Sequence, residues 1–345
     1  MNVSCRFRAC GLAIESDAPI AGLRPHECAT APDLRVTMRG TVDAPHADES
    51  DAVWYLSPYV DERGVPLLTI RLRESRYLLA YAEGATFLVS DSGSEVEAWW
   101  TPPLTDVDAA DYLLGSVLAF VLRLRGTVPL HASAVVIENR AVLFAGSAGA
   151  GKSSTAAAFA LLGYPVLSDD IVVVADDGGV MMAHPSHGHL SVWPDSAHGL
   201  FATESLPQHS AVYGKHRVDL IERGYPFRDS AVPIDTIFIL GNRSRVSRAS
   251  GGGHGESRGA LRPQEALMAL VGQTYGNYVL DAAMRAREFD LLGRVVGSVT
   301  VGDLAFNDRL EDLVPSCRAL ALQFGNGVGG HLKRTASTTR AGCPL

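Results

Sequence analysis

The stretch from Gly146 to Ser153 has the sequence GSAGAGKS, which matches the pattern G-x-x-x-x-G-K-S of a phosphate-binding loop. In such a loop, backbone N–H groups surround phosphate oxygens, and glycines adopt conformations that other residues resist. Lys152 would reach the β- and γ-phosphates, and the Ser153 hydroxyl would bind Mg²⁺. The pattern predicts an ATP site that comprises Gly146, Ser147, Ala148, Gly149, Ala150, Gly151, Lys152, Ser153 and Ser154.

Two adjacent carboxylates, Asp169 and Asp170, follow Lys152 by 17 and 18 residues. One helix and a short turn fill this interval, so we expect the strand 165–168 to lie close to the strand before the loop. Neighbouring residues on a strand point to opposite faces, so both aspartates reach the phosphates only if the strand ends there and the backbone turns. Phosphoryl transfer to a hydroxyl uses one carboxylate for the hydroxyl proton and another near Mg²⁺. An exposed acidic turn without a ligand is the alternative.

Several basic side chains could join this site. His131 lies on the strand before the loop strand, where it is a packing residue or, beside the Asp pair, a group that tunes a carboxylate or contacts a phosphate. Lys215 is one of only three lysines among 30 basic residues and could neutralise the transferred phosphoryl group, although a solvated basic face is equally expected. The spacing of His184, His187 and His189 would suit a metal on a strand, but no carboxylate or cysteine joins them, which favours a loop.

Regular elements that could position these residues follow from hydrophobic periodicity. The apolar run 141–145 predicts a strand before the loop, and residues 154–162 predict a helix that stops at Gly163. A strand at 130–137 precedes them, with a turn at 138–140. Further strands are expected at 171–175, 180–183 and 234–240, and further helices at 264–270, 288–296 and 316–322.

The N-terminal part has a different pattern. Residues 1–104 are strand-rich, with a meander expected from strands at 6–14, 67–72, 77–82 and 86–89. Residues 106–125 predict a helix that joins the halves, with acidic residues at its start and Arg123 and Arg125 at its end, as the helix dipole favours. We therefore predict a domain over 1–126, a second over 127–325 and a disordered tail over 326–345. The glycine-rich stretch 250–259 is expected to be an exposed loop.

Composition limits the class of protein. The chain has 345 residues, a formal net charge of −8 and a pI near 5.8, which argues against a general nucleic-acid binder. Five widely spaced cysteines without a C-x-x-C pair suggest reduced thiols rather than a disulfide framework or a zinc site. The N-terminus lacks the apolar region of a signal peptide, and the most apolar stretch, 112–124, is too short to span a bilayer. These features predict a cytoplasmic protein without a membrane partner.

Three segments together resemble the catalytic core of the HPr serine kinase/phosphorylase superfamily: Leu130-His-Ala-Ser133, GSAGAGKSS, and Gly163-Tyr-Pro-Val-Leu-Ser-Asp-Asp170. Residues 184–195 and Lys215 are similar to a diverged branch that includes kinases of lasso-peptide precursors. The resemblance implies an α/β fold: a P-loop kinase core of the HPr kinase/PEP carboxykinase type, a mixed sheet flanked by helices, with a strand-rich α+β N-terminal domain.

The resemblance also implies residue roles. Asp169 would be the general base, Ser153 and Asp170 would hold Mg²⁺, and His131 would lie beside the phosphates. True HPr kinases have Glu where this chain has Ser154, and their later glycine-rich signature has no clear counterpart here. These departures point away from HPr as the acceptor and away from the reverse phosphorylase reaction.

The combined expectation is an ATP- and Mg²⁺-dependent kinase that phosphorylates a hydroxyl, most simply a serine of a peptide or small protein. Its catalytic residues would be Asp169, His131, Lys152 and Lys215. A small-molecule kinase on the same core and a nucleotide-dependent regulator without catalysis are the alternatives. The sequence leaves open whether the chain forms a homo-oligomer.

Overall fold

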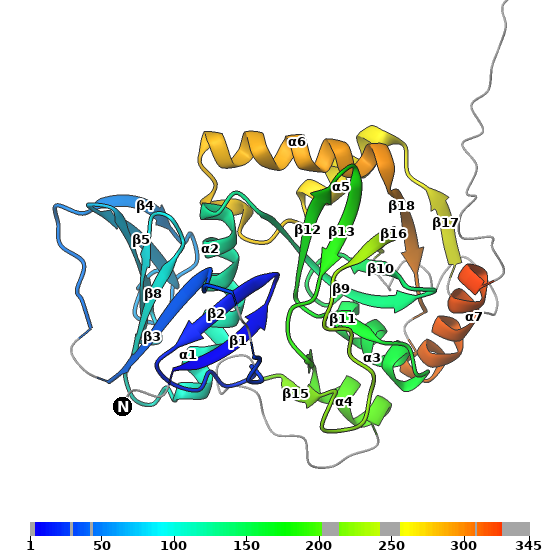
Figure 1. Ribbon diagram of the computed structural model, residues 1–345, viewed down its shortest axis with the longest axis horizontal. Coiled ribbons are helices and arrows are strands. Elements are labelled where there is room, and N and C mark those ends of the chain that lie inside the picture. The colour runs from blue at the N-terminus through cyan, green and yellow to red at the C-terminus, as the bar shows by residue number, and fades with distance from the viewer. Residues whose placement is uncertain are drawn as a thin grey trace, which may run out of the picture.

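A computed structural model describes residues 4–27, 30–41, 44–201, 214–241, 256–307 and 309–325. These residues form a mixed α/β structure with two large sheets (Figure 1). The first sheet has the order β1-β2-β3-β8-β7-β6-β5-β4. Its strands are β1 (Cys5–Ala9), β2 (Leu12–Ser16), β3 (Leu34–Gly40), β4 (Ala52–Leu56), β5 (Leu68–Arg73), β6 (Arg76–Tyr81), β7 (Ala85–Ser90) and β8 (Glu95–Trp100).

The meander expected in the N-terminal part is confirmed for β5 to β7, and it extends to β4 and β8, which the sequence did not predict; all five strands pair consecutively and antiparallel. The expected strand 6–14 is wrong in its extent, because the chain turns back at Cys10 and Gly11 to form the hairpin β1–β2. Both residues have positive φ, 54° and 80°, as two-residue hairpin loops of type I′ require. β3, which the sequence pattern did not reveal, lies parallel to both β2 and β8.

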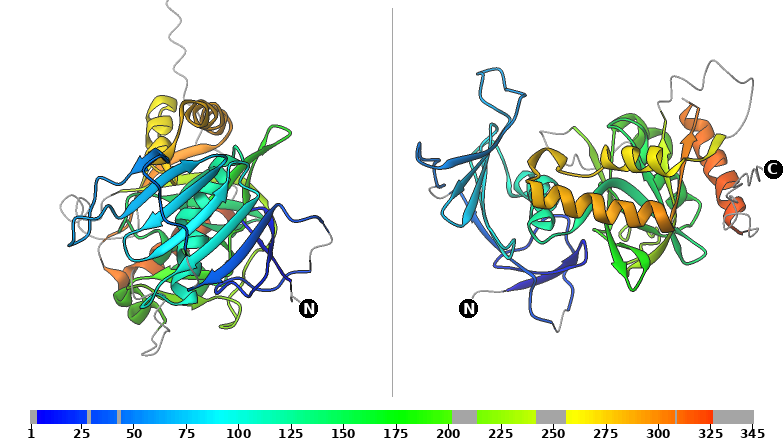
Figure 2. Two further views of the ribbon diagram at one scale, coloured as in Figure 1. Left: turned by 90° about the vertical axis from the view of Figure 1, so that its left-hand side faces the viewer. Right: turned by 90° about the horizontal axis from the view of Figure 1, so that it is seen from above.

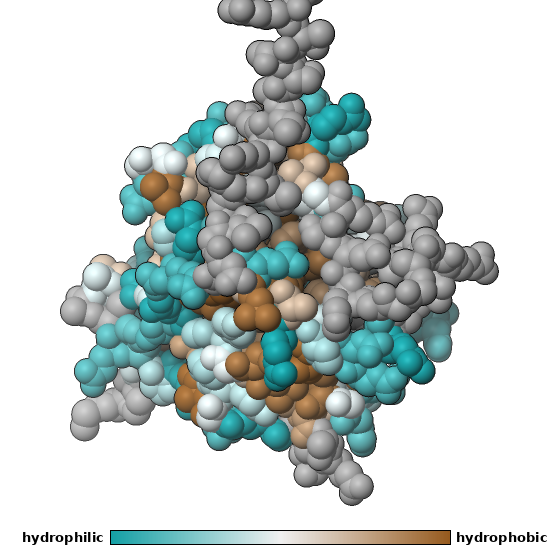
Figure 3. Space-filling view, turned by 90° about the vertical axis from the view of Figure 1, so that its right-hand side faces the viewer, coloured by the Kyte–Doolittle hydropathy of each residue, from teal (hydrophilic) through white to brown (hydrophobic). Residues whose placement is uncertain are grey.

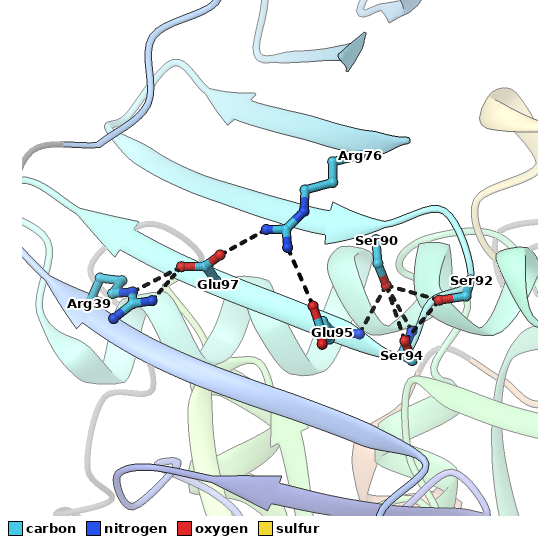
Figure 4. A network of polar contacts seen from close by, with 7 residues as sticks. All are labelled: Arg39, Arg76, Ser90, Ser92, Ser94, Glu95 and Glu97. Carbon is cyan, nitrogen blue, oxygen red and sulfur yellow. Dashed lines mark hydrogen bonds and ion pairs between the residues drawn. The ribbon is translucent and has the colours of Figure 1, made fainter. Parts of the chain in front are cut away.

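The two faces of the first sheet differ in polarity because side chains alternate along a strand. One face carries a ladder of ion pairs in which Glu97 accepts from Arg39 and Arg76, and Arg76 also meets Glu95 (Figure 4). The opposite face is apolar and packs on the helical segment that follows the sheet, with Phe87 fully buried. The polar face is therefore the outer one.

The expected helix 106–125 is confirmed in position but is not one regular helix. It consists of α1 (Asp106–Tyr112), a π-helical segment η1 (Leu113–Val117) and α2 (Leu118–Leu124). Arg123 lies in the last turn as expected, but it is 2% exposed and lies 2.7 Å from Glu288, itself 1% exposed. The interior of the protein therefore holds a buried ion pair that links α2 to a later helix.

The second sheet has the order β10-β9-β12-β13-β16-β18-β17, with β11 beside β9 and an additional pairing of β10 with β16. Its strands are β9 (Val128–Ile137), β10 (Arg140–Ala145), β11 (Val166–Ser168), β12 (Ile171–Asp177), β13 (Val180–His184), β16 (Val232–Leu240), β17 (Glu256–Ala260) and β18 (Thr300–Ala305). The expected strands at 130–137, 141–145, 171–175, 180–183 and 234–240 are confirmed. A separate antiparallel pair joins β14 (His189–Val192) to β15 (His216–Asp219).

Helices cover both faces of the second sheet, as Figures 1 and 2 show. Along β9 and β10, Val135 and Phe144 pack in one apolar cluster, whereas Val136 and Leu143 pack in another. The first cluster includes α3 (Lys152–Leu161), α4 (Pro194–Phe201) and α7 (Leu313–Gly325), and the second includes α5 (Pro263–Val271) and α6 (Ala282–Ser298). The 3₁₀ segments η3 (Asn277–Val279) and η4 (Leu310–Asp312) complete the described helices.

The strand expected at 165–168 is β11, and it lies one strand away from the loop strand, because β9 pairs with both β10 and β11. One expectation about this half needs correction. Part of the stretch expected as a loop at 250–259 is the strand β17, while residues 250–255 and the tail 326–345 lie outside the described residues. The boundary at residues 126 and 127 stays a prediction.

Two further observations concern the apolar character of the helices and of the surface. Among the described residues, no helix combines the length and apolar character that a bilayer crossing needs. The face seen in Figure 3 carries an apolar area in its lower half, surrounded by hydrophilic side chains.

Candidate functional site

The loop 146–151 connects β10 to α3 and begins the candidate site. A Cβ atom on Gly146 would lie 3.1 Å from the Ala150 Cβ and 3.1 Å from the Leu240 carbonyl oxygen, so a larger residue would displace the backbone. Gly151 precedes α3 with a left-handed φ of 99° and supplies no side-chain cap. The first N–H groups of α3 are thus left without a side-chain acceptor, as an anion at a helix N-terminus requires.

A pocket of about 110 Å³ lies beside this loop. Part of its wall comes from the loop and the start of α3, and part comes from the end of β14 and the start of α4. The lining residues are Gly149, Gly151, Lys152, Ser153, Ser154, Ser191, Val192, Trp193 and Ser196. The Ser154 and Ser196 hydroxyls lie 2.9 Å apart and link the two walls.

Lys152 is 8% exposed, and its Nζ donates to the carbonyl oxygens of Gly146 at 2.8 Å and Ser147 at 3.2 Å. Burial lowers the pKa of Lys152, while the charges of Asp170 and Asp169 oppose that change. The lysine is therefore held across the loop by its own backbone and lies within electrostatic reach of both aspartates.

Asp169 is 1% exposed and has a donor at each carboxylate oxygen. The Ser133 Oγ donates to its Oδ1 at 2.6 Å, and the Ser191 N–H donates to its Oδ2 at 2.9 Å. An ionised carboxylate has about four acceptor positions, so these two bonds fix the group without saturating it. Asp169 is therefore a rigid, buried carboxylate with unused acceptor positions.

The backbone reverses between the two aspartates, as the sequence pattern required for both to reach one site. The Ile171 N–H donates to the Asp169 carbonyl at 2.9 Å, and Asp170 between them has a φ of 68°. A three-residue turn with positive φ at its centre is an uncommon and strained γ-turn. The Ser168 hydroxyl stabilises this turn by donating to the Ile171 carbonyl.

Asp170 meets the predicted His131 directly. The His131 Nε2 lies 3.2 Å from the Asp170 Oδ1, and their side chains are 35% and 34% exposed. Burial by itself would raise the pKa of Asp170, but the hydrogen bond and charge of His131, with the charges of Lys215 and His187, lower it to about 2. Asp170 therefore remains ionised at neutral pH, as a metal ligand must.

The alternation along β9 explains why these groups meet. His131, Ser133 and Val135 share one face of the strand, and Val135 packs in the apolar cluster of α3. His131 also pairs across the sheet with Ile171, the residue after Asp170. Ser133 was missed in the sequence analysis, although its position two residues after His131 places it on the same face.

Lys215 lies beside β14 and belongs to the same electrostatic environment. Its Nζ is 5.5 Å from the ring centroid of Trp193, which lines the pocket. Its charge contributes to the lowered pKa of both Asp170 and Lys152. Lys215 therefore lies beside Trp193, a residue of the pocket wall that β14 and α4 supply.

The cluster of histidines does not form a metal centre. Within the described ranges, no group of three or more His, Cys, Asp or Glu side chains could hold a metal ion. His189 begins β14 and its ring stacks on that of His187 at 3.7 Å, while His184 ends β13. The proposed Mg²⁺ ligands, Ser153 and Asp170, are only two residues. Two are enough, because Mg²⁺ commonly binds one or two protein oxygens together with phosphates and water.

Comparisons with known proteins add little to this geometry. No protein-family model matches the chain, and no curated protein matches it significantly. Among solved structures, it is similar to the HPr(Ser) kinase/phosphatase from Coxiella burnetii, with 10% identity and a TM-score of 0.32 over 58% of this chain and 93% of that chain. A TM-score this low carries no argument, so the functional assignment depends on the site itself.

Proposed function

We propose that this protein is an ATP- and Mg²⁺-dependent kinase that transfers a γ-phosphate to a hydroxyl group. The observation that carries this proposal is that Ser191 lines the pocket beside the loop together with Lys152, and that its N–H donates to the Asp169 carboxylate at 2.9 Å. A glycine-rich loop at a helix N-terminus suits a polyphosphate, and two nearby carboxylates suit a hydroxyl and a divalent cation.

The proposed roles follow from burial and partners. Lys152 binds the phosphates at the start of α3, and Ser153 with Asp170 holds Mg²⁺, which would neutralise phosphate charge when bound. Asp169 orients the acceptor hydroxyl and accepts its proton, the role that the resemblance implies for it. Ser133 and Ser191 fix its carboxylate, which is 1% exposed and must become accessible to the acceptor for this step. His131 holds Asp170 in place, and Lys215 faces the transferred group.

For the acceptor, we propose a serine of a peptide or small protein, such as a lasso-peptide precursor. The resemblance of residues 128–220 to the HPr serine kinase superfamily motivates this choice, and Ser154 in place of Glu argues against HPr itself. A small-molecule acceptor is the second candidate. A regulator without catalysis is less favoured, because both aspartates lie within electrostatic reach of the loop lysine.

The test is a transfer assay with γ-labelled ATP and Mg²⁺, run separately on a peptide library and on a pool of hydroxylated metabolites. Label on peptides, absent with Asp169→Asn, supports the proposal, and label only on metabolites selects the second candidate. Nucleotide binding without any label transfer would overturn kinase activity and leave a regulator.

A further inference from the structure

A second and larger cavity, of about 560 Å³, lies between the N-terminal part and the segments that flank the β14–β15 pair. Its volume is in the range of ligand-binding pockets. One wall is the segment 22–26, which follows β2, and the other comes from the segments 185–188 and 221–229. We call this cavity the interdomain groove.

The interdomain groove is held open by contacts that need no ligand. The Cys10 N–H, at the tip of the β1–β2 hairpin, donates to the Pro185 carbonyl at 2.8 Å. Arg24 donates to both carboxylate oxygens of Asp219 at 2.9 Å, which fixes the segment 22–26 beside β15. A preformed groove of this kind reduces the ordering cost of binding.

The groove is continuous with the site described above. Ser186 lines it, and its hydroxyl lies within hydrogen-bond distance, 2.7 Å, of the hydroxyl of Ser168, the residue before Asp169. His187 and Gly188 line it and lead directly into β14, whose Ser191 N–H is bonded to Asp169. Three residues of extended chain separate Gly188 from Ser191, so along β14 this end of the groove lies about 10 Å from the Ser191 N–H that Asp169 accepts.

The chemistry of the lining suits a peptide. Leu23, Tyr225 and Phe227 give it apolar surface, and Ile221 remains 44% exposed beside it. Arg24 is neutralised by Asp219 and Glu222, and within the described residues Arg8 and Asp229 supply one unpaired charge of each sign. The lining also includes His26, whose Nδ1 is buried without a hydrogen-bond partner there. A polyanion fits this balance poorly, whereas an apolar side chain with polar backbone fits it well.

We propose that the interdomain groove binds a large apolar side chain of the peptide acceptor, two to four residues from the phosphorylated hydroxyl. The spacing follows because about 10 Å corresponds to about three residues of extended peptide. The spacing from the phosphorylated hydroxyl rests on the proposed kinase function. Binding of the apolar side chain to the groove does not, because it needs no phosphoryl transfer.

The experiment uses the full chain and a library of nonapeptides with a central serine and random flanking positions. Peptides retained by the immobilised protein in the presence of a non-hydrolysable ATP analogue are sequenced, and peptides phosphorylated with ATP are sequenced in parallel. We compare the parent with Ile221→Glu, Ile221→Ala and the control Val180→Glu, which changes an apolar side chain of similar exposure, 49%, on the β12–β13 hairpin.

The expected result is enrichment of large apolar residues at one position two to four residues from the serine. Ile221→Glu should reduce this enrichment about tenfold, the scale at which a pocket discriminates apolar groups, and Ile221→Ala should reduce it less. Val180→Glu should leave it unchanged. The proposed role of the groove is overturned if no position is enriched. It is also overturned if Ile221→Glu, with the same unfolding temperature as the parent, gives the same enrichment. Enrichment in the binding arm without any phosphorylation supports the groove and overturns the kinase function instead.

Discussion

The Ser133 hydroxyl donates a 2.6 Å hydrogen bond to the Asp169 carboxylate from the neighbouring strand β9. The same carboxylate accepts from the Ser191 N–H, so a side chain and a backbone group hold it from two sides. Its partner Asp170 is different, because a third of its side chain is exposed and its contact is the His131 imidazole. One aspartate is therefore fixed and buried, and the other faces the site.

Asp169→Asn should abolish phosphoryl transfer while nucleotide binding persists. Asparagine retains an acceptor for one of the two donors but cannot accept the hydroxyl proton, and loss of a general base typically costs about 10²- to 10⁴-fold in rate. Transfer from labelled ATP and binding of a fluorescent ATP analogue give the two readouts. Full transfer by this variant would show that another group is the base.

Ser133→Ala tests how much the hydrogen bond that holds the Asp169 carboxylate contributes, while Asp169 itself can still accept the proton. Removal of the hydroxyl leaves Asp169 with the Ser191 N–H alone, so we expect a fall in kcat smaller than that of Asp169→Asn, with nucleotide affinity unchanged. Restoration of activity by Ser133→Thr would confirm a positioning role. A rate equal to the parent would mean that Ser191 suffices to hold the carboxylate.

Acid should destabilise the protein partly through Asp170. Its pKa is about 2 in the folded protein and 3.8 in the reference state, so its contribution to stability is present above pH 4 and lost as the pH falls from about 4 to about 2. The hydrogen bond from His131 is the largest cause that lowers this pKa. The free energy of unfolding of His131→Ala should therefore fall less between pH 6 and pH 3 than that of the parent. Denaturant unfolding at the two pH values measures both.

Arg73→Gln offers a matched control for that measurement. Asp51 also has a pKa near 2, lowered first by its hydrogen bond from Arg73, and it lies beside β4 and β5 in the first sheet. This variant should likewise flatten the acid dependence of stability, but it should leave nucleotide binding at the parent's level. If His131→Ala gives the same acid dependence as the parent, His131 does not hold Asp170 ionised.

The buried ion pair of Arg123 and Glu288 should make a large difference to folding when only one partner is removed. Arg123 also donates to the Tyr275 carbonyl, at 3.1 and 2.9 Å, and the Tyr275 ring lies 5.3 Å from that of His131. Arg123→Met strands the Glu288 carboxylate in the interior, which should cost about 3–5 kcal/mol of unfolding free energy.

The double variant Arg123→Met/Glu288→Leu tests the cause of that loss. If an uncompensated buried charge is responsible, the second change should recover most of the stability, as measured by urea unfolding. A loss that the second change does not recover would instead point to the missing contacts with Tyr275.

The sequence predicted the chemistry of the site better than the contacts that build it. The loop residues and Asp pair were visible because their spacing is local, and the requirement for a turn at 169–170 followed from strand alternation. The buried ion pair of Arg123 could not be predicted, because a helix-end arginine and a buried ion-pair partner have the same local pattern and Glu288 is far away in the sequence. The position of β11 could not be predicted for the same reason, since which edge of β9 it takes depends on long-range pairing.

Lys152 and Lys215 should have separable effects, because Lys152 is bonded to the loop itself whereas Lys215 lies beside Trp193. Lys152→Ala should weaken ATP binding and turnover together, since this side chain spans the loop itself. Lys215→Met should leave ATP affinity near the parent's and lower kcat by about 10²- to 10³-fold, the cost of losing a donor or charge that acts in the transition state. Steady-state kinetics at saturating acceptor, with a fluorescent nucleotide for affinity, separates the two patterns. Unchanged kcat in Lys215→Met would leave this lysine as a surface cation packed on the Trp193 ring, 5.5 Å from its centroid.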